Sequence, residues 1–522
     1  MAYDTIYDVI VCGAGTSGVA AAIGAARTGA KTLLVERTGT MGGQMSLSGP
    51  PGFAYARLFN PQGKRDIGGI VEETYQRLFR TGHALPHLRY PVREKAGYSF
   101  SYVDPEWWTM LMFEMMDEEG VELLLDTLVV GVTKDGGAVT GITVENANGR
   151  NEIRGKIVID CTGEGYVAAQ AGCQMDCVSR EDIQPHTLAF TVDGVDWDTL
   201  LTYIREHPEQ FSYRQLIFPY ENANTQEDVM EMYRKCHDIT ELGELMGFYQ
   251  LRDMAFKNGD WHPYSGAGFF LTPREGGHIQ AHFQHSSQVD HALPTDAWDL
   301  TRCMVECRKQ NLIAWRFFKN YVPGFKNAYI TKVCTELRLR EGPRIVGDYI
   351  LTRDDVAECR QFADTIGKSS FKAGAYHVSS MDTLNACVTY PHHPRRRGHH
   401  GGGGQAGETD CCGPPAGPVR RACGRPPAGA DGTLPRAEAG LCLPGDGGAG
   451  RGPAVGPGPS ARAVLLKYGG VFGVFGRFSQ LAVSTEVSHE NIGNRPQRDG
   501  LPGRDGCGHP GHPGGRGAQP GV

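Results

Sequence analysis

The chain has 522 residues, enough for two or three domains with buried cores, and its charge is unevenly distributed. Residues 391–522 contain 33 of the 71 glycines and 17 of the 31 prolines, and the net charge of −7 divides into +6 for this segment and −13 for the residues before it. The acidic body argues against nucleic-acid binding, and no apolar run reaches the roughly 18 to 20 residues that would cross a membrane.

The start of the chain and its cysteines bear on the compartment. An apolar strand begins within a few residues of Met1, which leaves no room for a signal peptide. The fifteen cysteines are odd in number and scattered, and some, such as Cys12 and Cys161, lie within apolar strand patterns. Reduced, mostly buried thiols and a cytoplasmic location are therefore expected.

Residues 7–37, YDVIVCGAGTSGVAAAIGAARTGAKTLLVER, contain the most informative pattern of the chain. A short apolar strand is expected over 8–12, and it ends in a GxGxxG motif. Small apolar residues at helical spacing predict a helix over 16–28, and a second apolar strand follows over 31–35. Strand, glycines, helix and strand in this order are typical of dinucleotide-binding domains.

Each residue of the motif has a physical task in that interpretation. Gly13 permits the tight turn, Gly15 lets backbone amides approach a pyrophosphate, and Gly18 allows the helix to pack closely on the strand. Glu36, at the end of the second strand, can accept hydrogen bonds from ribose hydroxyls. The alternative is a purely structural glycine turn.

A glycine-rich loop, RTGTMGGQMSLSG, begins at Arg37, where an NAD-binding domain would normally enter another helix and strand. This arrangement resembles the flavoproteins with two dinucleotide-binding domains, in which such a loop runs beside the flavin. The resemblance implies FAD as cofactor and places Gly42, Gly43 and Gln44 near it, with Glu36 and Arg37 among the cofactor-binding candidates. A merely flexible loop is the alternative.

A helix with readable ends is expected after this loop. Asp104 is a suitable N-cap, Pro105 suits the first helical position and Gly120 marks the end. The apolar stripe predicts core packing rather than a ligand surface, and it consists of Trp108, Leu111, Met112 and Met115. Asp-Gly at 135–136 and Asn-Gly at 148–149 then predict hairpin turns before a return strand.

Residues 156–173, KIVIDCTGEGYVAAQAGC, resemble a signature of the FAD-dependent oxidoreductase family related to the flavoprotein A subunit of heterodisulfide reductase. The resemblance implies that Thr162 and Gly163 bring backbone against the cofactor. Cys161 stands where the family has Ala, and Tyr166 where it has an acid. Four later segments resemble the same family in the same order, so the resemblance extends over about residues 5 to 380: 183–200, 321–330, 337–356 and 362–371.

The catalytic candidates come from this resemblance. Arg340, Glu341 and Arg344 match a family pattern, and an Arg near the flavin would orient a carboxylate or carbonyl substrate. An ion-paired structural cluster is the alternative. His186, where the middle domain is expected to meet the flavin, is the candidate general acid or base, with a structural histidine as the alternative. The same two interpretations apply to three further histidines, His282, His285 and His377.

No metal site is expected. Some relatives of the superfamily hold iron–sulfur clusters, which need closely grouped cysteines. Before the Gly/Pro-rich segment, the closest pairs are spaced CxxxC, Cys173 with Cys177 and Cys303 with Cys307. No zinc pair, phosphate-binding P-loop or hydrolase nucleophile motif is present.

The stretch 389–412, TYPHHPRRRGHHGGGGQAGETDCC, allows four interpretations: a metal-binding tract, a nucleic-acid arm, a disordered linker, or translation out of frame. The family resemblance implies a strand and an Ala-rich helix here, completing the cofactor site, yet the resemblance stops near residue 386. GC-rich codons read in a shifted frame give mainly Gly, Pro, Arg and Ala, as observed. We therefore hypothesise a frameshift near 385–391, with a real disordered extension as the alternative.

The sequence thus predicts an α/β protein. A discontinuous Rossmann-like FAD-binding domain, 1–174 and 328–388, is interrupted by an α+β substrate domain, 175–327, and followed by a Gly/Pro-rich tail, 389–522, expected to be disordered. The predicted function is FAD-dependent hydride transfer with an unidentified small organic substrate, and an electron-transfer partner or a nicotinamide nucleotide is a further candidate. An inactive remnant with an incomplete flavin site and an NAD-dependent dehydrogenase are the alternatives.

Overall fold

The computed structural model describes most of the chain up to Pro391. All described residues belong to one compact unit, Met1–Leu481, and none to the second, Ala482–Val522. The described residues are 3–49, 55, 58, 65, 67–89, 99–181, 183–211, 226–262, 266–340, 342–347, 349–350, 352, 354–355, 358, 360–362, 365–369 and 388–391.

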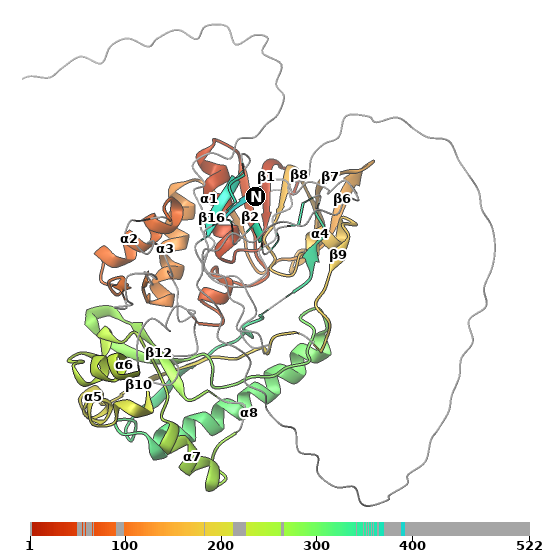
Figure 1. The fold of residues 1–522 in the computed structure, drawn as a ribbon. Helices are drawn as coiled ribbons and strands as arrows, with labels where there is room; N and C mark the ends of the chain where they lie inside the picture. Colours follow the sequence, from red (N-terminus) through yellow and green to blue (C-terminus); the bar gives the residue numbers. More distant parts are fainter. Residues whose placement is uncertain are drawn as a thin grey trace, which may run out of the picture. The chain divides into compact units, whose positions relative to one another are not determined.

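A six-stranded sheet, in the order β5-β2-β1-β8-β7-β6, forms the first half of the fold (Figure 1). The four strands β5, β2, β1 and β8 pair in parallel, and β7 and β6 extend the sheet as antiparallel strands. This is the Rossmann-like arrangement that the sequence predicts. The strands are β1 Ile6–Cys12, β2 Thr32–Val35, β5 Glu122–Leu124, β6 Leu128–Asp135, β7 Ala138–Asn146 and β8 Gly149–Asp160.

Burial explains why the inner strands read as continuous apolar runs. All four residues of β2 are buried, and so are the last four of β1, because both faces of a parallel sheet are covered. The outer hairpins turn at Gly136 and Gly149, both with positive φ, as the Asp-Gly and Asn-Gly pairs predict.

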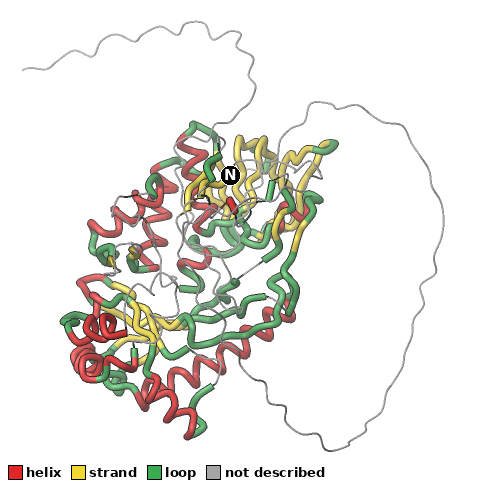
Figure 2. Tube along the Cα trace, viewed as in Figure 1, coloured by secondary structure: helices red, strands yellow, loops and turns green. Residues whose placement is uncertain are grey.

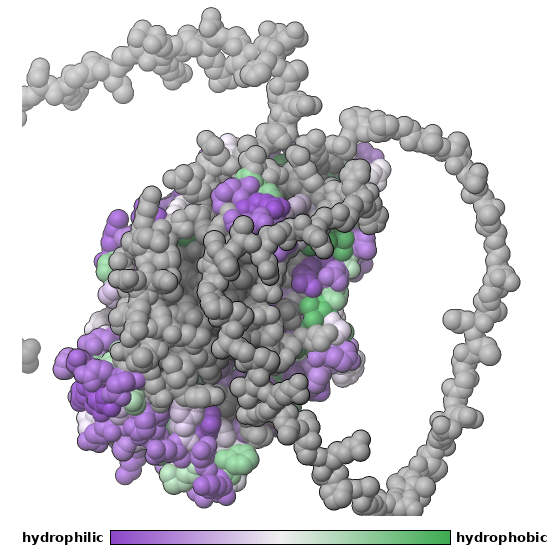
Figure 3. Space-filling model, viewed as in Figure 1, coloured by the Kyte–Doolittle hydropathy of each residue, from purple (hydrophilic) through white to green (hydrophobic). Residues whose placement is uncertain are grey.

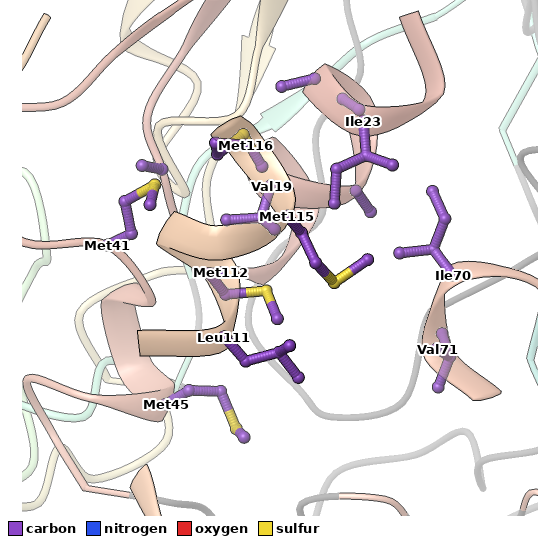
Figure 4. Close-up of a cluster of buried hydrophobic side chains, with 14 of the residues drawn as sticks. Val19, Ile23, Met41, Met45, Ile70, Val71, Leu111, Met112, Met115 and Met116 are labelled. Atoms are coloured by element: carbon purple, nitrogen blue, oxygen red, sulfur yellow. The ribbon is translucent and has the colours of Figure 1, made fainter. Parts of the chain in front are cut away.

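Three helices pack beside this sheet around a methionine-rich core (Figure 4). They are α1 Thr16–Arg27, α2 Ile70–Arg80 and α3 Pro105–Glu118. Asp104 caps α3, accepting hydrogen bonds from the Glu106 and Trp107 amides. The predicted stripe of α3 is buried, so its methionines are core residues rather than a ligand surface.

A five-stranded sheet, in the order β11-β12-β13-β10-β14, forms the second half, and every pair in it is antiparallel. Helices α5 Trp197–Glu206 and α8 Ala297–Tyr321 lie beside this sheet (Figure 2) and contribute to an aromatic core with it. In this core Phe283 packs edge-on against Phe318. The strands are β10 Phe190–Asp193, β11 Glu244–Met246, β12 Gly268–Pro273, β13 Ile279–Phe283 and β14 Tyr329–Val333.

Strand β14 lies on the other side of the domain boundary from where the sequence places it. The predicted inserted domain ends at residue 327, but β14 pairs with β10 and so belongs to the five-stranded sheet. Among the described residues after β14, no strand joins the six-stranded sheet. The remaining elements are α4 Tyr166–Gln170, α6 Gln226–Arg234, α7 Tyr249–Lys257, β3 Leu88–Arg89, β4 Ser99–Phe100, β9 Met175–Asp176, β15 Arg344–Ile345, β16 Thr365–Ser369 and β17 Val388–Pro391.

Strand β17, paired with β16, includes residues 389–391, which the sequence analysis assigned to the tail. The rest of the tail, 392–522, lies outside the described residues. No helix among the described segments is long and apolar enough to cross a membrane. The described surface around α5 and α6 is largely hydrophilic (Figure 3).

Candidate cofactor-binding site

The glycine motif forms a tight turn between β1 and α1. Gly13 has φ +96°, and a Cβ there would lie 2.6 Å from the Cys161 carbonyl oxygen. A Cβ on Gly18 would overlap the Gly13 carbonyl, so α1 approaches the turn closely only because both residues are glycine. At Gly15, in contrast, a Cβ would meet nothing within 4 Å. The three positions therefore differ: two are required by packing, and the third borders open space.

The amino end of α1 suits an anion. Gly15 is its N-cap and offers no side-chain oxygen to the first-turn amides, and the first turn contains no acidic residue. The helix is twelve residues long, so its amino end has a partial positive charge and amides without intrahelical partners. A pyrophosphate at this position would satisfy both.

Glu36 is fixed at the end of β2 beside this turn. Its Oε2 accepts a hydrogen bond from the Ala14 amide at 2.6 Å. Its Oε1 accepts from the amide and the hydroxyl of Thr38, both at 3.1 Å. The carboxylate is nearly buried, so its orientation is set by the protein before any ribose binds.

The glycine-rich loop over residues 37–49, named the Gly-Gly loop after Gly42 and Gly43, packs directly on the glycine turn between β1 and α1. The Gly42 amide donates to the Ala14 carbonyl at 2.8 Å, and Gly42 forms a parallel bridge with Gly15. Both Gly42 and Gly43 have positive φ, and a Cβ on Gly43 would lie 3.1 Å from the Gly15 Cα. Two segments about 28 residues apart in sequence thus form one surface, and the loop is held in place rather than merely flexible.

The loop continues along a later segment of the chain. The Gln44 side chain donates to the Leu339 carbonyl at 3.0 Å, and the Ser48 hydroxyl to the Leu337 carbonyl at 3.3 Å. Arg37, at the start of the loop, forms an ion pair with Glu336 at 2.6 Å but is mostly exposed. Such a pair adds little stability, so Arg37 mainly helps to join the loop to this segment.

The turn after β8 closes the site on its other side. Asp160, which the sequence analysis did not single out, organises it: Oδ1 accepts from the amide and hydroxyl of Thr162 at 3.0 and 2.7 Å, and Oδ2 from the Ala168 amide at 2.9 Å. Gly163 has φ +90°. Asp160 is part of the family signature at residues 156–173. An Asp two residues before a Thr can accept hydrogen bonds from the turn that follows, so the sequence contained a signal for this role.

His186 is held by the backbone at both ring nitrogens. Nδ1 accepts from the Arg340 amide at 3.3 Å, so Nε2 has the hydrogen and donates to the Ala292 carbonyl at 2.9 Å. The side chain is fully buried. This geometry matches the structural alternative, in which His186 positions the backbone of Arg340.

The predicted arginine cluster is divided. Arg340 is buried. Arg344, on β15, is exposed and forms an ion pair with Asp176 of β9 at 3.3 Å, as in the structural alternative. Glu341 lies outside the described residues, and so does His377. Gly342 lies next to Glu164, since its Cβ would be 3.8 Å from the Glu164 Cα, so this segment reaches the turn after β8.

Two buried polar residues lie close to the loop: His282, one of the histidines considered from the sequence, and Arg338, which the sequence interpretation missed. Arg338 is almost completely buried and donates to the Gln284 side-chain oxygen. His282 is equally buried, with Nδ1 3.1 Å from the Thr191 hydroxyl. Burial, with Arg338 and Lys332 adding to the effect, lowers the pKa of His282 to about 3, so the ring is neutral at neutral pH.

The described residues contain no group of side chains suited to a metal ion. Cys303 and Cys307 are buried thiols on α8, and burial raises their pKa values to about 11 and 12. Both thiols are therefore protonated at neutral pH, as buried core cysteines are.

The residues present fit a dinucleotide. Open space at Gly15, an uncapped helix end and a pre-oriented carboxylate meet the needs of a pyrophosphate and a ribose. Together with the parallel sheet, they define a dinucleotide-binding protein of the Rossmann-like class. The chain belongs to the FAD dependent oxidoreductase family, whose model matches residues 8–393. FAD, predicted from the sequence, is the cofactor of this family.

Several curated proteins are similar to part of the chain. The digeranylgeranylglycerophospholipid reductase of Thermoplasma acidophilum is 28% identical over 195 residues, covering 37% of this chain and 48% of that protein. Protein FixC of Salmonella typhi is 28% identical over 178 residues, covering 32% and 39%. The chain thus spans about half the length, or less, of these relatives.

Solved structures are more distant. A geranylgeranyl bacteriochlorophyll reductase-like protein from Thermoplasma acidophilum has 18% identity and a TM-score of 0.36, covering 64% of this chain and 66% of that chain. The p-nitrophenol 4-monooxygenase PnpA from Pseudomonas putida has 13% identity and a TM-score of 0.37, covering 66% and 70%.

The family match favours an FAD-dependent oxidoreductase over an NAD-dependent dehydrogenase and over an inactive remnant. It ends at residue 393, a few residues beyond the point near 386 where the quoted resemblance stops. None of the relatives named above is a heterodisulfide reductase, so that relation stays a prediction.

Proposed function

We propose that the protein catalyses hydride transfer between bound FAD and a small organic substrate. The observation that supports this most directly is the joined surface of the glycine turn and the Gly-Gly loop, made by the Gly42–Ala14 hydrogen bond and the Gly15–Gly42 bridge. When bound, FAD supplies the hydride chemistry, while the protein binds, orients and shields the reactants.

The cofactor contacts follow from the geometry above. The amides around Gly13, Gly15 and Gly18 would bind the pyrophosphate, and Glu36 would accept hydrogen bonds from the ribose. Gly42, Gly43, Gln44, Thr162 and Gly163 would border the remainder of the cofactor.

Among the catalytic candidates, we retain only Arg340 near the substrate. It is buried, and its backbone is held by His186 at a segment that lies along the Gly-Gly loop. His186 is proposed as a positioning residue. Arg344 is proposed as a structural ion-pair partner, because its side chain is exposed and engaged with Asp176.

We further propose a cytoplasmic location, with reduced thiols, and the transfer of electrons to or from a nicotinamide nucleotide or an electron-transfer partner. The described cysteines are free, and most of them are buried. A polar substrate is favoured over a long lipid such as those named for the reductase relatives, because the buried face opposite the Gly-Gly loop contains His282, Thr191 and Arg338.

Purified full-length protein tests the proposal. We expect a yellow protein that absorbs near 450 nm and bleaches with dithionite. A colourless protein that FAD cannot reconstitute would support the remnant instead. Nicotinamide binding without flavin would support the dehydrogenase alternative.

A further inference from the structure

A large aromatic side chain lies exposed at the first residue of α4. Tyr166 is 46% exposed, whereas Val167 and Ala168 next to it are buried. The Tyr166 amide donates to the Thr162 hydroxyl at 3.1 Å, so the turn after β8 fixes the position of this residue. Single exposed aromatic residues are common on protein surfaces, so the neighbourhood of the ring decides whether it has a ligand.

Three strand ends bring the turn after β8 to the cofactor site. Strand β1 lies between β2 and β8 and pairs with both in parallel, so the segments that follow the three strands leave the same edge of the sheet. A Cβ on Gly13 would lie 2.6 Å from the Cys161 carbonyl oxygen, and the Glu36 carboxylate accepts from the Ala14 amide. The turn that leads to Tyr166 and the carboxylate of Glu36 thus both lie against the glycine turn.

Arg37, the residue after Glu36, is close to Tyr166. Burial and Glu164 raise the pKa of the Tyr166 hydroxyl, and Arg37 lowers it, so the guanidinium acts on the tyrosine through space. An ion pair with Glu336 at 2.6 Å holds the guanidinium, yet the Arg37 side chain is 60% exposed. An aromatic ring and a planar cation therefore lie near each other, and a ligand can reach both.

The backbone beside these side chains leaves room for a ligand. A Cβ on Gly163 would meet nothing within 4 Å, as at Gly15. Gly163 has φ +90°, a conformation that favours glycine, so this position of the turn suits a residue without a side chain. Open space therefore borders both the glycine turn and the turn after β8.

The chemistry of FAD indicates which of its groups would reach Tyr166 and Arg37. In the proposed site, the Glu36 carboxylate accepts hydrogen bonds from the adenosine ribose. Adenine is bonded directly to that ribose, so it would lie beside Glu36 and its neighbour Arg37. The flavin is at the opposite end of the cofactor, beyond the pyrophosphate. Tyr166 and Arg37 would therefore meet the adenine and not the flavin.

Adenine suits this pair of side chains. It is a flat, uncharged aromatic base, and such bases stack on aromatic rings and on arginine guanidinium groups. The acid that the family pattern has at position 166 would offer only acceptor oxygens, whereas Tyr166 offers the face of a ring. A guanidinium that Glu336 already holds loses little freedom when a base stacks on it.

Resting on the proposed binding of FAD, we propose that Tyr166 and Arg37 hold the adenine of the cofactor between a phenol ring and a guanidinium. Tyr166 is then a cofactor-binding residue at a position where the family pattern has an acid. This stacking gives the adenosine half of FAD a large share of the binding free energy, so the site selects FAD over FMN.

The full-length protein, freed of FAD, is titrated by calorimetry with FAD, ADP and FMN. ADP contains the adenosine and lacks the flavin, whereas FMN contains the flavin and lacks the adenosine. Tyr166→Ala should bind FAD and ADP about tenfold more weakly, the loss expected for one base–aromatic stack. Tyr166→Phe keeps the ring and should bind both within about twofold of the unchanged protein. The affinity for FMN should stay the same in both variants.

Two further variants test the other parts of the proposal. Arg37→Lys keeps the charge but loses the planar guanidinium, so it should bind ADP about threefold more weakly, or worse. Tyr166→Asp introduces the acid of the family pattern and should bind ADP at least as weakly as Tyr166→Ala.

Tyr329→Ala is the matched control, because Tyr329 is 56% exposed on β14, which belongs to the other sheet. It should leave all three affinities unchanged. Thermal unfolding of the FAD-free proteins is measured for every variant, and the midpoints should agree within about 2 °C. If FMN binds too weakly to measure, these midpoints decide whether a lost ADP affinity comes from the base contact or from a disturbed fold.

The outcomes separate this proposal from the proposed function. A protein that holds reducible FAD but binds ADP equally well with Tyr166→Ala overturns the adenine contact alone. A Tyr166→Ala protein that loses FMN affinity as much as ADP affinity, or unfolds at a clearly lower temperature, also overturns it, because Tyr166 would then support the fold. Tyr166-dependent binding of ADP in a protein that FAD cannot reconstitute overturns the proposed function and leaves the contact. A protein that binds neither FAD nor ADP overturns both.

Discussion

Gly15 and Gly18 differ in what surrounds them, although both belong to one motif. A serine at Gly15 meets nothing within 4 Å and is a good N-cap, so the FAD-free protein should keep its stability within about 1 kcal/mol. FAD affinity should nevertheless fall at least tenfold, because the side chain would occupy the path of the pyrophosphate. Thermal unfolding of the FAD-free protein and a fluorescence titration with FAD measure the two effects.

Gly18→Ser is the matched control for that variant. Its Cβ would overlap the Gly13 carbonyl, so it should destabilise the FAD-free protein by several kcal/mol, as overpacking does in cores. If both variants lose stability equally, Gly15 is a packing residue and not a ligand-facing one.

His282 gives a pH dependence to stability. Its folded-state pKa of about 3 lies below the value near 6.5 expected in the unfolded chain. Between these values the unfolded chain binds a proton that the folded protein does not. The free energy of unfolding therefore falls as the pH falls below about 6.5, by up to about 1.4 kcal/mol per pH unit.

His282→Phe should make this loss shallower between pH 6 and pH 4, and urea unfolding of both proteins at several pH values measures it. Above pH 7 the contribution of His282 should not change with pH. Parallel curves for the two proteins across pH 4 to 6 would contradict a buried, neutral His282.

The sequence predicts those site residues whose roles depend on their spacing within one short segment. Gly13, Gly18 and Glu36 follow from a strand, a turn and a helix within one short segment. Arg338 and His282 depend on which face of a strand is buried against which partner. Their alternation with apolar residues can be read from the sequence. The sequence does not indicate, however, that the polar face of the sheet is buried as well.

At the scale of elements, α3 is held at its amino end by one residue with two roles. Asp104 caps the helix and forms an ion pair with Arg274, the residue that follows β12, so it joins α3 to the end of that strand. Asp104→Asn keeps a capping oxygen but loses the ion pair. Asp104→Ala loses both, so it should lower the free energy of unfolding by about 1 kcal/mol more than Asn does.

Chemical denaturation of the two Asp104 variants measures this difference. Equal losses would mean that the ion pair alone stabilises the start of α3. A larger loss for Asn than for Ala would contradict both roles.

Elements formed by local pattern were predicted well, and elements defined by distant pairing were not. The ends of α3, the two hairpin turns and the order of strand, helix and strand follow from caps, turn residues and periodicity. The assignment of β14 failed because it pairs with β10, more than 130 residues earlier. A strand does not show in its own sequence which sheet it joins.

At the scale of the whole molecule, the match to the family model and the change of composition meet within a few residues. The match ends at residue 393, and the Gly/Pro-rich segment begins near 391. Chains truncated after residue 393 should therefore unfold at the same temperature as the full-length protein within about 2 °C and hold the same fraction of FAD. A clear loss in either measurement would show that the tail contributes to the fold or the site.

The frameshift hypothesis makes a stronger prediction about the same boundary. If the reading frame changes near residues 385–391, translating the underlying DNA in one of the other two frames should give a strand with a Gly-Arg motif and an Ala-rich helix. The chain restored to that frame should then bind FAD at least tenfold more tightly than the present one, because the amino end of that helix would add a dipole and donors to the site. Neither frame yielding such a helix would refute the hypothesis. A restored chain with unchanged FAD affinity would instead show that the glycine turn and Gly-Gly loop suffice to hold the cofactor.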